Sequence, residues 1–577
     1  MRRLIAILIS ISLASVVLLG WQWFPWRKTD LNDEFTGLPE SLQEHIWELE
    51  HVTFELEAKF GKAVTLAMRD GRTDDLQRFL MTGFSAELPA ERVTSAEASW
   101  WTETRFEEGL DHRAADANEF AEYLVGTLSK FDHIEQLKLK VLSIDKNDTA
   151  SGTQSWDLRF LLLARGSTQD GGVSAFESEH LVRCRFSDDE DIEQGRIVET
   201  WRVKSEFFRS VPKPFFVEAT KAFGLDQLGM RDNWKPQWDP VRTYSLQVGV
   251  EDYDRDGYLD IAVSGLDGKQ MLLRGDGTSF TDVTTEVGLP QYRSKPQVAL
   301  ANWFDFDNDG YPDLLLGDSL YRNDRGTRFI NVTNGSGLQF LEETMGCAIA
   351  DYDADGKLDL YILHHRSAMQ TDRKIGYIDD AFTGAENRLY RNLGYGRFED
   401  VTETAGVGAG QRHSFAATWL DANDDRLPDL YVANDFGANQ LFVNDGNGRF
   451  HNIADQVGVG DFATSMGVAS GDLDGDGTAE IYVANMFSKM GRRIIAHVQE
   501  TDYPAGVYAQ IQGSCAGNRL YRRRSSGEDY EEISELMGVS KVGWAYAPAL
   551  VDLDSDGWLD IYATCGFLSF DSTKPDG

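Results

Sequence analysis

Cysteine and basic residues are scarce in this 577-residue sequence. The four cysteines, Cys184, Cys347, Cys515 and Cys565, are widely scattered and show neither metal-site nor redox spacing, so we do not expect disulfides to hold the fold. Lys and Arg total 56 against 94 Asp and Glu, and the net charge of -38 argues against binding to nucleic acid, whose phosphates would be repelled. Divalent cations are the better expectation for a partner.

Recognisable catalytic motifs are also lacking. The sequence contains no nucleophile motif, phosphate-binding loop or zinc motif, so we assign no catalytic residue and no organic cofactor. His364 and His365 could bind a transition metal, but a histidine pair in a loop without further ligands is more often polar surface.

A long apolar run occurs at the N-terminus. Arg2 and Arg3 precede apolar residues from Leu4 to Leu19, and a tryptophan-rich segment continues to Lys28. A tryptophan cluster stands where a cleavable signal peptide usually has its small-x-small site, so an uncleaved signal anchor over 1–28 is favoured over a signal peptide. With either a signal anchor or a signal peptide, the bulk of the chain is expected to be periplasmic or extracellular, because little of the remaining sequence is apolar enough to span a membrane.

Residues 31–215 differ in pattern from the rest. Apolar residues recur at helical spacing from Leu42 to Phe60, and a second helical stretch covers 74–81. Strand-like alternation follows, over 137–144, 154–164, 181–186 and 200–208. Helices followed by long antiparallel strands predict an α+β domain, whose layout resembles the nuclear-transport-factor-2-like cone.

From residue 216 onward the sequence is repetitive. A carboxylate-rich nonapeptide occurs six times: DYDRDGYLD at 252, DFDNDGYPD at 305, DYDADGKLD at 351, DANDDRLPD at 421, DLDGDGTAE at 472 and DLDSDGWLD at 552. Each copy is followed by a short apolar strand, and several are followed by a strand and turn and then a closing strand. Each unit therefore predicts four short strands, which is one blade of a β-propeller.

These repeats resemble the FG-GAP/VCBS family, a repeat type also found in the propeller of integrin alpha chains. The resemblance covers about 216–566 and implies a β-propeller with calcium in the blade loops. Related bacterial proteins often continue into a further C-terminal domain, which leaves open whether this chain is a short member or a truncated one.

The spacing within the nonapeptide suits a calcium ion, which takes six to eight oxygen ligands. Side chains 1, 3 and 5 of a tight loop can converge, residue 7 contributes its carbonyl, and residue 9 closes the ring. The candidate ligands in the five regular copies are Asp252, Asp254, Asp256, Asp260, Asp305, Asp307, Asp309, Asp313, Asp351, Asp353, Asp355, Asp359, Asp472, Asp474, Asp476, Glu480, Asp552, Asp554, Asp556 and Asp560.

The fourth copy is expected to bind calcium weakly. It offers Asp421, Asn423, Asp425 and Asp429, but Arg426 replaces the turn glycine at position 6 and adds a positive charge. The alternative for all six copies is a set of solvated Asp-Gly turns, which would leave several carboxylates repelling one another without a cation. We therefore expect five or six structural calcium ions.

The number of blades depends on how the ring closes. A strand over Phe215–Thr220 could join the C-terminal end, with Phe567–Phe570 adding another strand, which gives six blades. Seven blades are the alternative. Two insertions, over about 364–387 and 486–518, follow the second strand of their blades, opposite the calcium loops. They mark this face as a candidate ligand surface, unless they are merely tolerated insertions.

Two further features are discounted. Arg274, Gly275 and Asp276 spell an adhesion tripeptide but occupy the slot of a hairpin turn. Trp303, Trp419 and Trp544 lie in or beside first strands and are expected to pack between blades.

The sequence favours a calcium-binding extracytoplasmic β-propeller that acts as a protein- or glycan-binding or adhesion module. One alternative is an envelope enzyme acting on polysaccharide, since a propeller fold alone does not exclude catalysis. The other is a structural or assembly component of the cell envelope.

Overall fold

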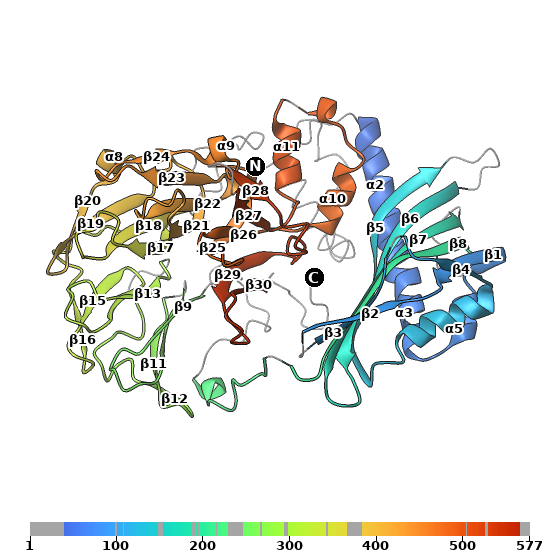
Figure 1. Ribbon diagram of the computed structural model, residues 1–577, viewed down its shortest axis with the longest axis horizontal. Helices are drawn as coiled ribbons and strands as arrows, with labels where there is room; N and C mark the ends of the chain where they lie inside the picture. The colour runs from blue at the N-terminus through green and yellow to red at the C-terminus, as the bar shows by residue number, and fades with distance from the viewer. Residues whose placement is uncertain are drawn as a thin grey trace, which may run out of the picture. The chain divides into compact units, whose positions relative to one another are not determined.

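The computed structural model describes two compact units (Figure 1). The N-terminal unit comprises Gly37–Glu218 together with Arg493–Val498, and the repeat unit comprises Ala219–Arg492 and Gln499–Gly577. The described residues are 40–98, 101–107, 109–147, 154–186, 192, 195–214, 216–228, 246–265, 268–293, 298–341, 344–365, 384–503, 505–524 and 529–565.

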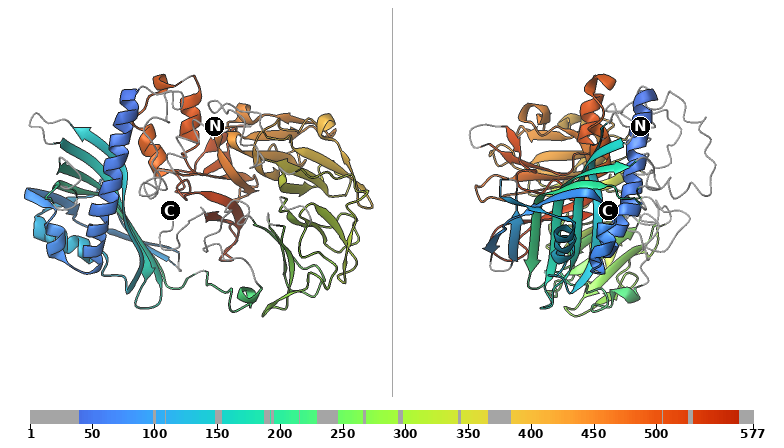
Figure 2. Two further views of the ribbon diagram at one scale, coloured as in Figure 1. Left: turned by 180° about the vertical axis from the view of Figure 1, so that it is seen from behind. Right: turned by 90° about the vertical axis from the view of Figure 1, so that its right-hand side faces the viewer.

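The N-terminal unit is built on one eight-stranded sheet with helices packed against it (Figures 1 and 2). Its strands are β1 (Leu80–Pro89), β2 (Val93–Ala98), β3 (Trp101–Phe106), β4 (His112–Ala115), β5 (His133–Asn147), β6 (Gln154–Ser167), β7 (Val173–Phe186) and β8 (Val198–Val211). The path β2-β3-β8-β7-β6-β5 is antiparallel throughout, whereas β1 pairs in parallel with β8 and antiparallel with β4.

Most of the helices precede the strands, as the helical spacing predicts, but the stretch predicted over 74–81 is helical only to Gln77 and β1 begins at Leu80. They are α2 (Glu40–Glu55), which continues through a π-helical turn over Leu56–Gly61 into α3 (Lys62–Arg69), then α4 (Thr73–Gln77) and, between β4 and β5, α5 (Ala117–Thr127). Alternate residues of β7 are buried, because a strand with one face on a core places every second side chain inside. Phe60, Phe160 and Trp201 contribute aromatic rings to that core.

A short segment from the repeat region completes the N-terminal unit. Arg493, in α10 (Lys489–Ile495), is only 6% exposed and pairs with Glu50 of α2 through two nitrogens, at 2.8 and 2.6 Å. A third nitrogen of Arg493 donates to the Val141 carbonyl at 2.8 Å. Part of the second predicted insertion is therefore committed to packing in this unit.

Among its described residues, the repeat unit contains five four-stranded antiparallel meanders and a final two-stranded sheet, and the fourth and fifth meanders are joined edge to edge into one eight-stranded sheet. Each full sheet is a meander of consecutive strands: β9 (Leu246–Glu251), β10 (Asp260–Gly265), β11 (Gln270–Gly275), β12 (Phe280–Asp282); β13 (Ala301–Phe304), β14 (Asp313–Leu316), β15 (Ser319–Asn323), β16 (Phe329–Asn331); β17 (Thr344–Ala350), β18 (Asp359–His364), β19 (Arg388–Gly394), β20 (Arg397–Asp400); β21 (Ser414–Leu420), β22 (Asp429–Ala438), β23 (Gln440–Asn444), β24 (Phe450–Asn452); β25 (Phe462–Gly471), β26 (Glu480–Asn485), β27 (Arg519–Arg523), β28 (Tyr530–Glu532). The final sheet is β29 (Ala545–Val551) with β30 (Asp560–Cys565).

Short helices complete the unit: α8 (Thr402–Ala405), α9 (Ala454–Val457) and α11 (Val507–Gly513).

Neighbouring sheets pack face to face in chain order. A Cβ atom on Gly249 of β9 would lie 2.3 Å from the Ala301 carbonyl oxygen of β13, so glycine is required where these first strands approach. Aromatic rings fill the space between sheets: Trp303 stacks with Tyr253, and Trp419 contacts Tyr361 edge-on, each at a centroid distance of 6.4 Å. The predicted four-strand units and the packing of these two tryptophans are confirmed.

The prediction of a closing strand over Phe215–Thr220 is wrong. Residues 216–219 form no strand, and Phe216 and Val217 are 61% and 74% exposed. The following chain contacts the first sheet instead, where the Phe280 amide donates to the Phe223 carbonyl at 3.2 Å. Pro212 and Pro214 lack the amide hydrogens that a paired strand uses, which disfavours a strand starting here.

Two other predictions fall outside the described residues, namely the N-terminal anchor over 1–28 and the strand over Phe567–Phe570. Among the helices in the described ranges, none combines the length and the apolar character needed to cross a membrane.

Candidate metal centres

All six nonapeptides occupy equivalent loops, which join the first strand of each sheet to the second. The second strand starts at position 9 of every copy, at Asp260, Asp313, Asp359, Asp429, Glu480 and Asp560. Because the sheets are meanders packed in order, the six loops belong to the same end of the repeat unit.

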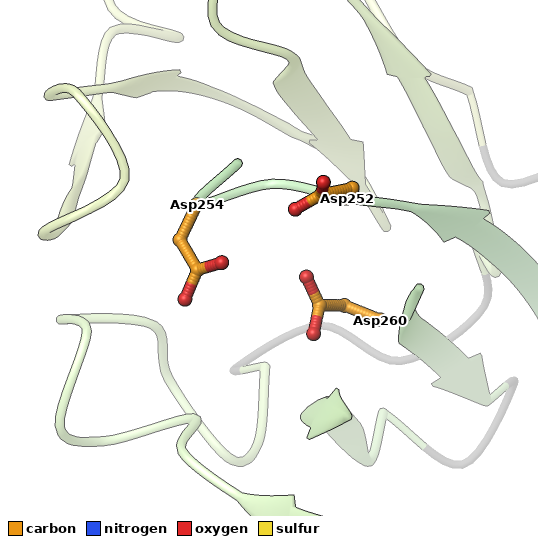
Figure 3. A group of neighbouring side chains, drawn as sticks. All are labelled: Asp252, Asp254 and Asp260. Atoms are coloured by element: carbon orange, nitrogen blue, oxygen red, sulfur yellow. The ribbon is translucent and has the colours of Figure 1, made fainter. Parts of the chain in front are cut away.

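Three carboxylates converge in the first loop, as Figure 3 shows for Asp252, Asp254 and Asp260. One oxygen from each lies within 4.8 Å of the other two, which is a spacing that one cation can bridge. Four more groups meet the same criterion: Asp305, Asp307 and Asp313; Asp351, Asp353 and Asp355; Asp472, Asp474 and Glu480; Asp552, Asp554 and Asp560.

Some predicted ligands lie outside these groups. Position 5 joins its group only in the third copy, through Asp355, and there position 9, Asp359, is left out. Among the described residues, the carboxylates of the fourth copy form no such group, although Asp421, Asp425 and Asp429 make the same loop hydrogen bonds as the others.

Backbone amides hold the carboxylates in place. In the first loop, Asp252 accepts from the amides of Asp256 at 3.1 Å and Gly257 at 3.0 Å, through different oxygens. Asp260 accepts from the Tyr253 amide at 3.1 Å and from the Gly275 amide of β11 at 2.9 Å. Each of these oxygens keeps a lone pair for a cation, so the hydrogen bonds orient the ligand set without consuming it.

The backbone turns through the left-handed region at two positions. At position 6, Gly257 has a φ of 92°, as the sequence pattern predicts. Position 4 is also left-handed, with a φ of 62° at Arg255, and this was missed because non-glycine residues stand there in five of the six copies. In the fourth copy Asp424 and Arg426 both adopt a positive φ, at 64° and 68°, so that loop carries more backbone strain.

The family comparison agrees with this loop pattern. The FG-GAP-like repeat family matches residues 252–316, 305–362 and 421–483. Residues 252–362 and 421–483 consist of FG-GAP-like repeats. The matched segments contain the first five nonapeptides.

Similar proteins include Cartilage acidic protein 1 from three vertebrates. The mouse (Mus musculus) and human (Homo sapiens) proteins are each 24% identical, over 396 and 395 residues, which is 57% of this chain and 59% and 58% of theirs. The protein of Xenopus tropicalis is 23% identical over 384 residues, 55% of this chain and 57% of its own. The chain thus covers less than two thirds of these relatives.

Among solved structures, the chain is similar to a crystal structure described as BBS1N in complex with ARL6DN, soaked with mercury, at 10% identity and a TM-score of 0.25 over 59% of this chain and 88% of that one.

In the first five loops, the carboxyl at position 9 is the one most affected by burial. Desolvation raises the pKa of Asp313 to about 8 and that of Asp359 to about 7, against the opposing effect of the amides that donate to them. The pKa values of Asp260, Asp429 and Glu480 rise to about 6, 6 and 7 for the same reason. A bound cation would compensate the charge that burial disfavours.

Calcium affinity should therefore fall as the pH is lowered from about 8 to 6, because protons compete for these buried carboxyls. Without metal the stability trend has the opposite sign. The folded pKa values lie above the unfolded value near 4, so the metal-free fold loses stability as the pH rises toward 8. Calorimetric calcium titrations at pH 6, 7 and 8 measure the effect. An affinity that stays constant to pH 5 would contradict it.

A buried asparagine, missed by the sequence analysis, links neighbouring FG-GAP-like loops. The amide nitrogen of Asn392 in β19 donates to the Phe306 carbonyl of the preceding loop at 2.9 Å and to the Leu358 carbonyl of its own loop at 3.0 Å. Its backbone amide donates to Asp359 at 2.7 Å. Asn323 and Asn444 repeat all three contacts in the second and fourth sheets.

The equivalent position differs in the other sheets. The first sheet has Gly275 there, and the fifth has Arg523, which pairs with Asp424 of the fourth loop at 2.6 Å. In the sequence these asparagines recur at the end of the short motifs YRN and VN, but the motifs do not indicate contact with a neighbouring repeat.

Replacing Asn392 with alanine should lower the free energy of unfolding by about 1–3 kcal/mol, because two buried carbonyls lose their donor. It should also weaken calcium binding in the second and third loops. Urea unfolding with and without calcium measures both effects, and Asn447→Ala, in an exposed turn, is the matched control. Equal behaviour of the two variants would contradict a linking role.

The adhesion tripeptide and the histidine pair both lie at the ends of strands. Asp276 accepts hydrogen bonds from the amides of Thr278 and Ser279, so the last residue of the adhesion tripeptide begins the turn between β11 and β12, while Arg274 and Gly275 end β11. The interpretation of the histidine pair as loop surface is wrong for His364, which is fully buried at the end of β18 with its ring nitrogen 2.7 Å from the Glu386 carbonyl.

Proposed function

We propose that this protein is an extracytoplasmic, calcium-stabilised β-propeller that binds a protein or glycan ligand, as an adhesion-type module does. The five carboxylate groups, repeated at one end of the repeat unit, carry the proposal. The match to the FG-GAP-like repeat family supports the same proposal. The calcium ions serve to stabilise the loops.

The proposed architecture has six blades, with the sheet of β29 and β30 as the incomplete sixth. The proposed anchor is the apolar segment over 1–28, which would hold the propeller at the outer side of a membrane. The ligand face in this proposal is the end opposite the calcium loops. There the chain between β18 and β19 forms the longest connection not committed to the N-terminal unit.

The test is binding of the full chain to immobilised glycans and to envelope proteins, with 1 mM calcium or with chelator. Binding should require calcium, because the loops order the sheets that carry the ligand face. Replacing residues 366–383 with a short Gly-Ser linker should abolish binding without changing the melting temperature. Replacing the turn 445–448, at the calcium end, is the matched control. Binding that survives the first replacement would refute the assigned face.

A further inference from the structure

Two histidines and one aspartate from three separate segments meet in the repeat unit. His365 follows β18, His413 precedes β21, and Asp435 lies within β22. The His365 Nε2 atom is 3.5 Å from an oxygen of Asp435, and the rings of His365 and His413 have centroids 5.1 Å apart. The Asp435 amide also donates to the His413 carbonyl at 2.8 Å, which fixes the two segments together.

This cluster is separate from the calcium loops. Strands β18 and β22 start at the loop residues Asp359 and Asp429, and His365 and Asp435 lie six residues further along. At about 3.3 Å per residue, that is on the order of 20 Å from the calcium end. The cluster therefore belongs to the opposite end of the sheets, which is the proposed ligand face.

The surroundings are largely closed to water. His413 is 6% exposed, and the side chains of His365 and Asp435 are 20% and 16% exposed. The Phe415 ring contacts the His365 ring at 5.4 Å and the Tyr546 ring at 6.3 Å. A carboxylate and two imidazoles held together in such a setting interact more strongly than they would on an open surface.

The donor set selects a cation other than calcium. Imidazole nitrogens suit zinc and similar borderline transition metals, whereas calcium takes oxygen ligands almost exclusively. Two imidazoles bound tetrahedrally at Zn–N distances of about 2.0–2.1 Å place their ring centroids roughly 5 Å apart. The observed ring spacing matches that geometry. The donor atoms are not all within 4.8 Å of one another, so the rings must turn in place on binding.

We propose that His365, His413 and Asp435 bind one zinc-class divalent ion at the end of the repeat unit opposite the calcium loops. Three protein ligands leave the fourth tetrahedral position open to water or to a donor group of a bound partner. The site gives the ligand face a metal-dependent contact that is chemically distinct from the structural calcium sites. The metal site is independent of which ligand binds this face.

The test uses Co²⁺ and Zn²⁺ with the full chain in excess calcium, which keeps the loops filled. One equivalent of Co²⁺ should give the visible absorption of a tetrahedral site, and Zn²⁺ should displace it. His365→Gln and His413→Gln should each weaken Zn²⁺ binding at least 100-fold, and Asp435→Asn about 10-fold. His451→Gln, on the exposed part of β24, should leave binding unchanged.

Melting temperatures measured in calcium show whether a variant is misfolded. His365→Gln changes a partly exposed side chain, so this variant should melt within about 2 °C of the unaltered chain. Tetrahedral absorption that persists in both histidine variants would overturn the proposal. So would the absence of Zn²⁺ binding in the unaltered chain. A signal lost in Asp254→Asn but kept in His413→Gln would assign the ion to a calcium loop instead and would equally overturn it.

Discussion

Chelating calcium should lower the melting temperature of the repeat unit by on the order of 20 °C. A ligand that binds only the native state adds about 2.7 kcal/mol per site when its concentration is 100 times the Kd. Five carboxylate groups would together contribute on the order of 10 kcal/mol. For domains of 150–250 residues, each kcal/mol shifts the melting temperature by about 2–4 °C, and somewhat less for larger ones.

Calorimetry of the full chain measures this shift. The transition of the N-terminal unit serves as an internal control, because no carboxylate group of the loop type occurs among its described residues. Excess magnesium should replace calcium poorly, since it demands a smaller octahedral site. If chelator shifts the transition of the repeat unit by less than about 2 °C, calcium does not stabilise this fold.

Single loops can be compared within the same experiment. Asp307→Asn in the second loop should remove most of one site's stabilisation, because Asp307 belongs to a converging group. Asp421→Asn, at position 1 of the fourth loop, should change the calcium-dependent stability little, because Asn423 replaces the carboxylate at position 3 there and Arg426 adds strain. Equal losses would show that the fourth loop binds calcium as well as the others.

The loops could be predicted from sequence because their chemistry is local. All nine residues of DYDRDGYLD act within one turn, so alternate carboxylates and a glycine suffice to specify the turn and most of the converging carboxylates, although the predicted ligand Asp256 lies outside the group. Repetition then fixes the strands on either side, since each copy has to join equivalent strands. Sequence therefore predicted the four-strand units and the position of the loops between first and second strands.

Contacts between repeats could not be predicted in this way. Asn392 contacts Phe306, 86 residues earlier, and no local pattern encodes such a pairing. The strand expected over Phe215–Thr220 failed for a related reason. Alternating apolar residues indicate an extended segment but name no partner strand, and the chain beyond it contacts β12 through Phe223 instead. His365, His413 and Asp435 are likewise brought together only by the packing of β18, β21 and β22.

The insertion between β26 and β27 was predicted as part of a ligand surface, and one of its residues instead stabilises the N-terminal unit. Arg493 is charged, 6% exposed and satisfied by three hydrogen bonds, two to Glu50 and one to the Val141 carbonyl. Removing one partner of a buried ion pair is far more costly than removing both, because the remaining charge stays desolvated. The pair therefore predicts a large effect of a single substitution.

Arg493→Ala should lower the free energy of unfolding of the N-terminal unit by about 3 kcal/mol, at the lower end for buried pairs because Glu50 keeps slight exposure. Arg493→Lys should lower the free energy of unfolding by about half as much, since an ammonium group keeps the charge but cannot reproduce the two-nitrogen contact.

The neighbouring Arg492→Ala is the matched control. The Arg492 side chain is 46% exposed and lies 3.5 Å from Glu535, so the effect of this variant should stay within about 0.5 kcal/mol. Urea unfolding of the full chain in calcium, followed by the fluorescence of the buried tryptophans Trp156 and Trp201, measures the difference. If Arg493→Ala matched Arg492→Ala, the segment Arg493–Val498 would contribute nothing to this unit's stability, and the whole insertion would return to the candidate ligand surface.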